Sequence, residues 1–257
     1  MLDFWTLVGF GILLGSLLAI ASLFLGVDAD PKLDNLHDAL PGYNCGVCGY
    51  VGCSGYAKSL AAGTVSLELC EPGGHAVKQK IAKILGVAPP AETEKYISCV
   101  FCNGGVRAID AFAYSGMRSC RAAILVQGGY KKCRWGCLGF GDCVAVCPVQ
   151  AITMSEQGLP VIDGDKCAHC SLCIKTCPRN ILKRSPRREG KLVRCSNHDN
   201  GKAARSVCAA PCIGCGICVK HCLYQAVVLK DNLAVIDPAK CTNCGVCAEK
   251  CPTQAIK

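Results

Sequence analysis

Cysteine runs in the last third of the sequence carry its clearest chemical signal. Residues 241–252 have the spacing Cys-x2-Cys-x2-Cys-x3-Cys-Pro, which is typical of bacterial proteins that bind two [4Fe–4S] clusters. In that arrangement three thiolates of a run hold one cluster, and the fourth reaches the neighbouring cluster. A similar run lies upstream, with Leu223 where proline is usual. Crosswise pairing of the two runs predicts one site with Cys212, Cys215, Cys218 and Cys251, and another with Cys222, Cys241, Cys244 and Cys247.

An internal repeat places the same pattern earlier in the chain. The tripeptide Val-Ile-Asp precedes both Cys167 and Cys241. The run that begins at Cys167 has regular spacing, whereas its upstream partner is stretched to Cys-x3-Cys-x5-Cys-x3-Cys. We interpret the extra residues, which include Gly136, Gly139 and Gly141, as a widened loop that keeps its site. Crosswise pairing then predicts sites formed by Cys133, Cys137, Cys143 and Cys177 and by Cys147, Cys167, Cys170 and Cys173.

The remaining cysteines predict two further sites with different spacing. One segment has the pattern Cys-x2-Cys-x4-Cys-x16-Cys, and its many glycines allow backbone N–H groups to approach the sulfurs. Its cysteines are Cys45, Cys48, Cys53 and Cys70. Zinc is an alternative there, since zinc also accepts four unevenly spaced cysteines. Five cysteines remain, enough for a sixth cluster and one spare: Cys99, Cys102, Cys120, Cys195 and Cys208. Spacing alone leaves open whether Cys99 or Cys102 is the spare residue.

The composition favours iron–sulfur clusters over other uses of cysteine. The chain has 25 Cys among 257 residues, a density shared by disulfide scaffolds, zinc proteins and iron–sulfur proteins. Zinc ribbons use separate Cys-x2-Cys pairs, which the runs of three plus one do not resemble. The formal net charge of +9 treats each Cys as a neutral thiol. Six oxidised clusters with their thiolates would remove about 12 charges, so net charge gives no argument for nucleic-acid binding.

A local basic run follows the first pair of cysteine runs. Its cations are Lys183, Arg184, Arg187, Arg188, Lys191 and Arg194. The run is either the solvated face of a linker or a docking patch for an acidic protein partner. Under the second interpretation the docking residues are Lys183, Arg184, Arg187 and Arg188.

An apolar segment at the start of the sequence predicts a membrane anchor. Residues 4–27 would form a helix about 36 Å long, enough to cross the core of a bilayer. No Lys or Arg precedes this segment, and it is too long for the core of a cleavable signal peptide. Gly11 and Gly15 form a G-x-x-x-G motif that lets a partner helix approach closely. Because thiolate clusters need a reducing compartment, we expect a single span in the cytoplasmic membrane, with the cysteine-rich part in the cytoplasm.

The elements between these sites predict an α+β fold. Short apolar tails follow the cysteine runs at residues 151–152, 180–182, 226–228 and 255–256, and they predict the small strands of ferredoxin-like modules. The predicted divisions are a transmembrane anchor (1–28), a small helical Gly/Cys-rich cluster domain (29–90), a linking segment that contributes ligands to an additional cluster (91–130), a first ferredoxin-like pair (131–184), a basic linker with cluster ligands (185–208) and a second ferredoxin-like pair (209–257).

Several motifs in order resemble one known family. They are the transmembrane start, the box Asn-Cys-Gly-x-Cys-Gly-Tyr-x-Gly-Cys at residues 44–53, Cys-Asn-Gly-Gly at 102–105 and Gly-Cys-Leu-Gly-x-Gly-Asp-Cys at 136–143. Over nearly its whole length the chain resembles the B subunit of the Rnf electron-transport complex, in the longer form with two ferredoxin-like pairs. The resemblance implies that Cys102 joins Cys120, Cys195 and Cys208 at the additional cluster and that Cys99 is spare. The stretched run at Cys133 matches the form found in that family.

The resemblance also implies a function. Complexes of that family pass electrons from reduced ferredoxin to NAD and pump sodium ions or protons, and their B subunit receives the ferredoxin electrons. No G-x-G-x-x-G follows a predicted strand in this sequence, so we expect NAD reduction and ion pumping on other subunits. The chain would then relay electrons through about six [4Fe–4S] clusters. Two alternatives are a membrane-tethered polyferredoxin serving another redox enzyme such as a hydrogenase, and a zinc-stabilised scaffold without redox function.

Overall fold

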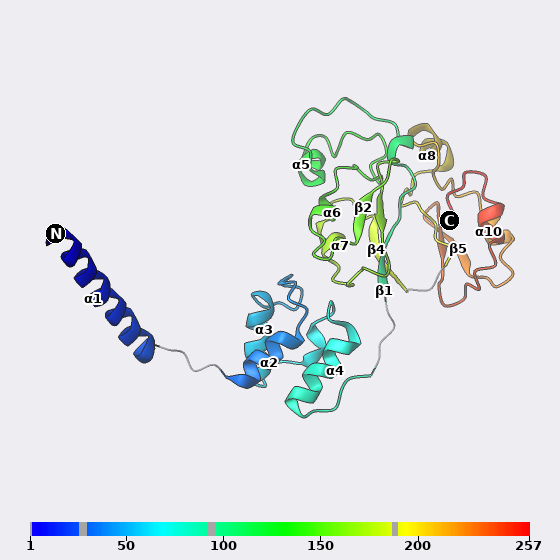
Figure 1. Ribbon diagram of the computed structural model, residues 1–257. Helices are drawn as coiled ribbons and strands as arrows, with labels where there is room; N and C mark the ends of the chain where they lie inside the picture. Colours follow the sequence, from blue (N-terminus) through cyan, green and yellow to red (C-terminus); the bar gives the residue numbers. More distant parts are fainter. Residues whose placement is uncertain (1, 26–29, 92–95, 187–189) are drawn as a thin grey trace.

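The N-terminal helix stands apart from the other elements of the chain. The computed structural model describes residues 2–25, 30–91, 96–186 and 190–257. Helix α1 (Leu2–Leu25) projects away from the remainder in Figure 1. Its segment Phe4–Ser22 has a mean hydropathy of 2.1 and none of it is buried. Among the described residues this is the one helix that is long and apolar enough to cross a membrane.

A small helical unit follows α1. It contains helices α2 (Pro31–Ala39), α3 (Gly52–Ala61) and α4 (Gly74–Leu85) and the 3-10 turn η1 (Leu67–Leu69). The Asp30 side chain caps α2 by accepting from the backbone N–H of Lys32, and α4 ends at Gly86 in the left-handed conformation. Leu36, Tyr56, Leu60 and Ile81 are fully buried, so the helices enclose a core of their own that also contains Cys70.

Two modules with the same local structure form the rest of the chain. Each has a two-stranded antiparallel sheet, β2 (Ile152–Met154) with β3 (Pro160–Ile162) and β5 (Val227–Lys230) with β6 (Leu233–Ile236). Each also has two short helices, α6 (Asp142–Ala145) with α7 (Leu172–Thr176) and α9 (Ile217–Lys220) with α10 (Val246–Glu249). The Val-Ile-Asp repeat has the same role in both modules, because the backbone N–H of Asp163 donates to Ala151 and that of Asp237 donates to Ala226.

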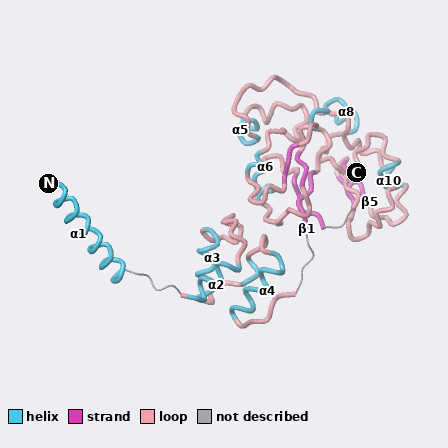
Figure 2. The backbone as a smooth tube through the Cα atoms, viewed as in Figure 1, coloured by secondary structure: helices cyan, strands magenta, loops and turns pink. Residues whose placement is uncertain are grey.

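Segments that precede each module pair with its last residues. Strand β1 (Tyr96–Val100) runs antiparallel to β4 (Leu182–Pro186), with Val100 opposite Leu182. In the second module Val193 forms the equivalent bridge with Ile256. Figure 2 shows that the strands are short and that loops make up much of both modules. The other described elements are η2 (Gly105–Arg107), α5 (Cys120–Leu125) and α8 (Gly201–Val207).

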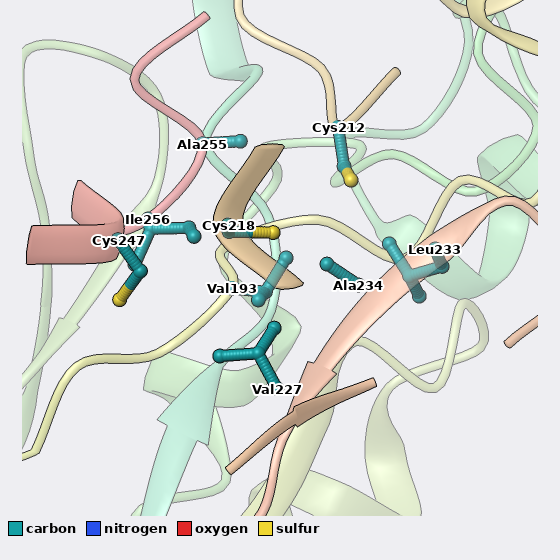
Figure 3. Packing of buried hydrophobic residues seen from close by; sticks show 9 residues of the cluster. All are labelled: Val193, Cys212, Cys218, Val227, Leu233, Ala234, Cys247, Ala255 and Ile256. Atoms are coloured by element: carbon teal, nitrogen blue, oxygen red, sulfur yellow. The ribbon is translucent and has the colours of Figure 1, made fainter. Parts of the chain in front are cut away.

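Cysteines belong to the cores of the modules. In the second module Val193, Val227 and Leu233 pack in one buried cluster with three cysteines. Figure 3 shows the sulfurs of Cys212, Cys218 and Cys247 among these aliphatic side chains. The predicted outline of an apolar N-terminal helix, a small cluster domain and tandem modules is confirmed. The α+β class stays a prediction, because the sheets that the described residues form have only two strands each.

Candidate metal centres

The second module brings together two sets of four cysteines. One cavity is lined by Cys212, Cys215, Cys218 and Cys251. A second is lined by Cys222, Cys241, Cys244 and Cys247. Their free volumes, including the openings to solvent, are about 350 and 330 Å³. The structure therefore places these cysteines in the crosswise sets that their spacing predicts.

A cavity in the first module contains an unexpected cysteine, and we call it the Cys120 site. It is lined by Cys120, Cys137, Cys143 and Cys177, with a free volume of about 380 Å³. The predicted set had Cys133 instead of Cys120, so the grouping is corrected at these two residues. The reason lies in the register of the run. Cys137 and Cys143 are spaced as the first and third cysteines of a regular run, and Phe140 stands at the middle position.

Cys120 takes the place of a cysteine at position 140, and Asp142 fixes the segment that contains it. The Asp142 carboxylate accepts from the backbone N–H of Cys120 at 2.9 Å, from that of Arg121 at 3.0 Å and from the Ser119 hydroxyl at 2.9 Å. Although burial opposes ionisation, these donors lower the pKa of the Asp142 carboxyl. The first turn of α5 is thereby attached to the residue directly before Cys143.

Cys133 lies in another cavity, which we call the bridging site. This site is lined by Cys102, Cys133, Cys195 and Cys208 and has a free volume of about 320 Å³. Cys102 and Cys195 each follow, by two residues, a valine that pairs with the last strand or bridge of a module. Cys208 comes directly after α8. The predicted additional site is thus found with Cys133 in the position expected for Cys120.

The bridging site contacts a neighbouring site on each side. The backbone N–H of Cys137, from the Cys120 site, donates to Cys102 Sγ at 3.4 Å. The backbone N–H of Cys212, from the second module, interacts with the Cys195 thiol. Burial raises the pKa of Cys195 to about 12, although the N–H groups of Asn197 and Cys212 favour the thiolate. The bridging site therefore joins the two modules through the ligand segments themselves.

The structure also brings together Cys147, Cys167, Cys170 and Cys173 in the first module, and Cys45, Cys48, Cys53 and Cys70 in the helical unit. Burial raises the pKa of Cys170, and the thiols of Cys173, Cys45 and Cys147 add to the rise. The backbone N–H of Ala151 donates to Cys147 Sγ at 3.3 Å, as Ala226 does to Cys222 and Ala255 to Cys251 at the same distance.

In the helical unit, burial raises the pKa of Cys70 to about 11, and the thiols of Cys53, Cys48 and Cys45 contribute. Asn44 fixes this loop, because its side-chain oxygen accepts from the backbone N–H of Cys53 at 2.8 Å.

The cysteine sets have the donor chemistry of an iron–sulfur cluster, with four thiols around one cavity. Within the described part of the chain, no three Cys, His, Asp or Glu side chains are placed to hold a single ion. Each of the four cavities described above is lined by four cysteines. Gly104 leaves space at the bridging site, since a Cβ there would lie 3.4 Å from Cys208 Sγ.

Buried N–H donors around the cavities point to an acceptor of the same kind. Four of them have no partner among the residues that the structure describes: Arg107 Nε, Trp135 Nε1, Arg179 Nε and Arg194 Nε. An unpaired buried donor costs about 1–3 kcal/mol. The sulfide and thiolate sulfurs of an anionic [4Fe–4S] cluster would supply acceptors at these positions.

Comparisons with known proteins agree with this chemistry. Residues 40–72 match a family described as “Putative Fe-S cluster”, and residues 132–181 and 211–255 match the 4Fe-4S dicluster domain. The B subunit of the Na(+)-translocating ferredoxin:NAD(+) oxidoreductase complex of Acetobacterium woodii is 40% identical over 89% of this chain and 68% of its own length.

The B subunit of the ion-translocating oxidoreductase complex of Methanosarcina acetivorans is 37% identical over 91% of this chain and 89% of its own. That of the proton-translocating ferredoxin:NAD(+) oxidoreductase complex of Clostridium ljungdahlii is 40% identical over 88% and 80%. The chain belongs to the Rnf B-subunit family. The resemblance seen in the sequence motifs is confirmed, and this member of the family is an iron–sulfur electron-transfer component of an ion-translocating complex whose other subunits are its partners.

Other predicted residues of this Rnf protein also have defined places. Cys102 lines the bridging site, whereas Cys99 lies on β1 opposite Lys183 and beside Ser185. In the basic run, Arg184 pairs with Glu71 of the helical unit, and Lys183 lies over the ring of Phe101 at 5.3 Å. Arg187 and Arg188 lie outside the described residues.

Proposed function

We propose that the chain holds six [4Fe–4S] clusters in one row and relays electrons from reduced ferredoxin to other subunits of an ion-pumping ferredoxin:NAD oxidoreductase. Bound clusters of this kind supply one-electron transfer. The chain's own residues determine the order of the sites. The Cys45 thiol of the helical unit raises the pKa of Cys170 in the first module, so these two sites are neighbours. Within the first module, Cys173 likewise raises the pKa of Cys143 in the Cys120 site. From there the Cys120 site contacts the bridging site, which contacts the second module.

The observation that carries this proposal is the bridging site. Without it the two modules would be separate carriers that each need a docking surface. With it, neighbouring sites share ligand segments, and Cys102 accepts an N–H from a cysteine of the next site. Three of its four cysteines, Cys102, Cys133 and Cys208, are no more than 8% exposed. The protein therefore insulates this junction from solvent.

The names of the relatives support the remaining parts of the proposal. The relatives from Acetobacterium and Clostridium are named as subunits of ferredoxin:NAD(+) oxidoreductase complexes, so we assign reduced ferredoxin as the electron donor. Helix α1 would cross the membrane once, with the cysteine-rich units in the reducing cytoplasm. Reduction of NAD and movement of the ion would take place on partner subunits.

A break at the bridging site tests the relay. Cys208→Ala should remove the cluster at that site while the five other sites keep their iron. After rapid mixing with reduced ferredoxin, the visible bleaching of the clusters should split into a normal phase and a phase slowed at least tenfold, because electrons can no longer cross between modules. Cys99→Ala is the matched control and should leave a single normal course. Unchanged bleaching in Cys208→Ala would contradict the relay. Co-purification with a hydrogenase instead of membrane subunits would favour a polyferredoxin role.

A further inference from the structure

The bridging site differs from both of its neighbours in the groups that line it. Its cavity contains one cation, Arg194, and the polar residues Asn103, Trp135 and Asn197. The adjoining cavity of the second module is lined only by uncharged residues, chiefly cysteines, glycines and aliphatic side chains. In the cavity of the Cys120 site the cation Arg179 is accompanied by the anion Asp142. Of the three adjacent cavities, the bridging one alone has a lining cation without a lining carboxylate.

Hydrogen-bond donors converge on the bridging cysteines. Cys102 Sγ accepts from the backbone N–H groups of Gly104 and Cys137, each at 3.4 Å. Asn197, whose side chain is 1% exposed, gives its backbone N–H to Cys195 Sγ at 3.5 Å and its side-chain amide to Cys133 Sγ at 3.8 Å. N–H···S contacts of this kind stabilise the more negative, reduced form of a cluster.

Two arginines near this site keep their charge uncompensated. Neither Arg107 nor Arg194 has a carboxylate partner among the ion pairs of the described residues, and the Nε of each is buried without an acceptor. Arg107 is fixed by Asn103, whose side-chain oxygen accepts from Nη2 at 2.6 Å. The acids close by are paired elsewhere: Asp110 with Lys131 at 2.7 Å and Asp199 with Arg134 at 3.3 Å.

We infer that Arg194 and Arg107 make the bridging site easier to reduce than the site on either side, so that it stores an electron between the two modules. The N–H donors do not make the difference, because Cys251 of the neighbouring site also accepts a backbone N–H, from Ala255 at 3.3 Å. The inference rests on the proposed function, since it concerns clusters held by these cysteines. In the step concerned, a ferredoxin-type donor supplies one electron through a neighbouring site, and a cluster at the bridging site would gain it with no bond made or broken. The added negative charge is attracted by buried cations more strongly than it would be in water. Burial alone lowers reduction potentials, and it opposes the cations here, because Cys102, Cys133 and Cys208 are buried whereas Cys215 of the neighbouring site is exposed. The two cations must therefore outweigh the burial of the bridging site.

Redox titration of the full-length chain in detergent, followed by electron paramagnetic resonance, tests the inference. Cys208→Ala identifies the bridging signal as the one that disappears. In the wild type this signal should develop at a higher potential than those removed by Cys120→Ala and Cys215→Ala, which report on the neighbouring sites. Arg194→Gln should weaken reduction of the bridging cluster about tenfold, a fall of about 59 mV for a one-electron couple. Arg194→Lys should restore most of the wild-type value, and Lys80→Gln, which removes an exposed cation from the helical unit, should change nothing.

The outcomes separate this inference from the proposed function. Full iron content with the bridging signal below either neighbour, or an unchanged midpoint in a fully loaded Arg194→Gln protein, would overturn the stored-electron inference and leave the relay intact. Preparations that hold no clusters after anaerobic reconstitution would overturn both. If Arg194→Gln does not load, the wild-type order of the three signals still decides the matter, because it requires no change at Arg194.

Discussion

At the scale of single residues, the exchange of Cys120 and Cys133 gives a direct prediction. Cys120→Ser should disturb the site of Cys137 and Cys143 and leave the bridging signal in place, whereas Cys133→Ser should do the reverse. Each variant should lose or convert one cluster, seen as a loss of up to about four iron atoms per chain. Cys99→Ser serves as the control and should keep the full iron content. Loss of the bridging signal in Cys120→Ser would restore the grouping that spacing alone suggested.

Asp142 offers a second prediction at this scale, because its carboxylate attaches α5 to the run that contains Cys143. Asp142→Ala leaves the donors of Ser119, Cys120 and Arg121 without their acceptor. At a net value of about 1 kcal/mol for each hydrogen bond, the segment should open more often and release iron to a chelator several-fold faster. Asp163→Ala is a matched control, since Asp163 caps only its own turn. Equal iron release from both variants would show that Cys120 is held by other contacts.

At the scale of elements, sequence reasoning succeeded where pattern is local. The two copies of the Val-Ile-Asp repeat lie at equivalent places in two equivalent sheets. The apolar tails after Cys147, Cys177 and Cys222 begin or enter strands, as their composition predicts. The tail at residues 255–256 forms an isolated bridge rather than a named strand. Such features follow from residues close together in the chain, so periodicity and turn chemistry predict them well.

The errors came from pairings between distant segments. The sequence around Cys120 does not predict that α5 packs beside Asp142, which lies in a later segment. A signal was nevertheless available, because Phe140 interrupts the register of its run at the position of a ligand. The valines before Cys102 and Cys195 were another signal: Val-x-Cys occurs at both places where a preceding segment closes a module. Because four cysteines follow one another in this stretched run, spacing placed Cys133 with Cys137 and Cys143, although of these three only Cys137 and Cys143 keep the regular separation.

The basic run makes a further prediction at the element scale. Replacing Lys183, Arg184, Arg187 and Arg188 with Glu should slow reduction by ferredoxin at low salt, and the difference should fade as salt rises, because exposed charges act over about 8 Å at physiological ionic strength. A small chemical reductant should react at the normal rate. Stopped-flow bleaching measures both. Arg184 pairs with Glu71, so Glu71→Gln is the control that breaks this pair without adding acid. Equal rates for wild type and the quadruple variant would identify the run as a linker.

At the scale of the whole molecule, α1 is separate from every cluster site. Deleting residues 1–27 should give a soluble, brown protein that retains about 24 iron and 24 sulfide per chain, as six clusters require. The physical reason is that the segment Phe4–Ser22 of α1 has no buried residue, and the four-cysteine sets begin at Cys45. Membrane fractionation and iron analysis check the result. A truncated chain that stays with the membrane would show a second attachment, and an iron content near 20 would mean that one of the six sites holds no cluster.

The wide sequence separation of the bridging cysteines has a consequence for biosynthesis. Domains emerge from the ribosome in order, and earlier ones begin to fold first. The set from Cys45 to Cys70 is complete early in translation, whereas Cys102 and Cys133 must wait until Cys195 and Cys208 have been made. During that interval both remain reactive thiols that oxidants or stray metal ions can capture. A ribosome that stalls between the modules would therefore leave a nascent chain with a half-built site and two reactive thiols.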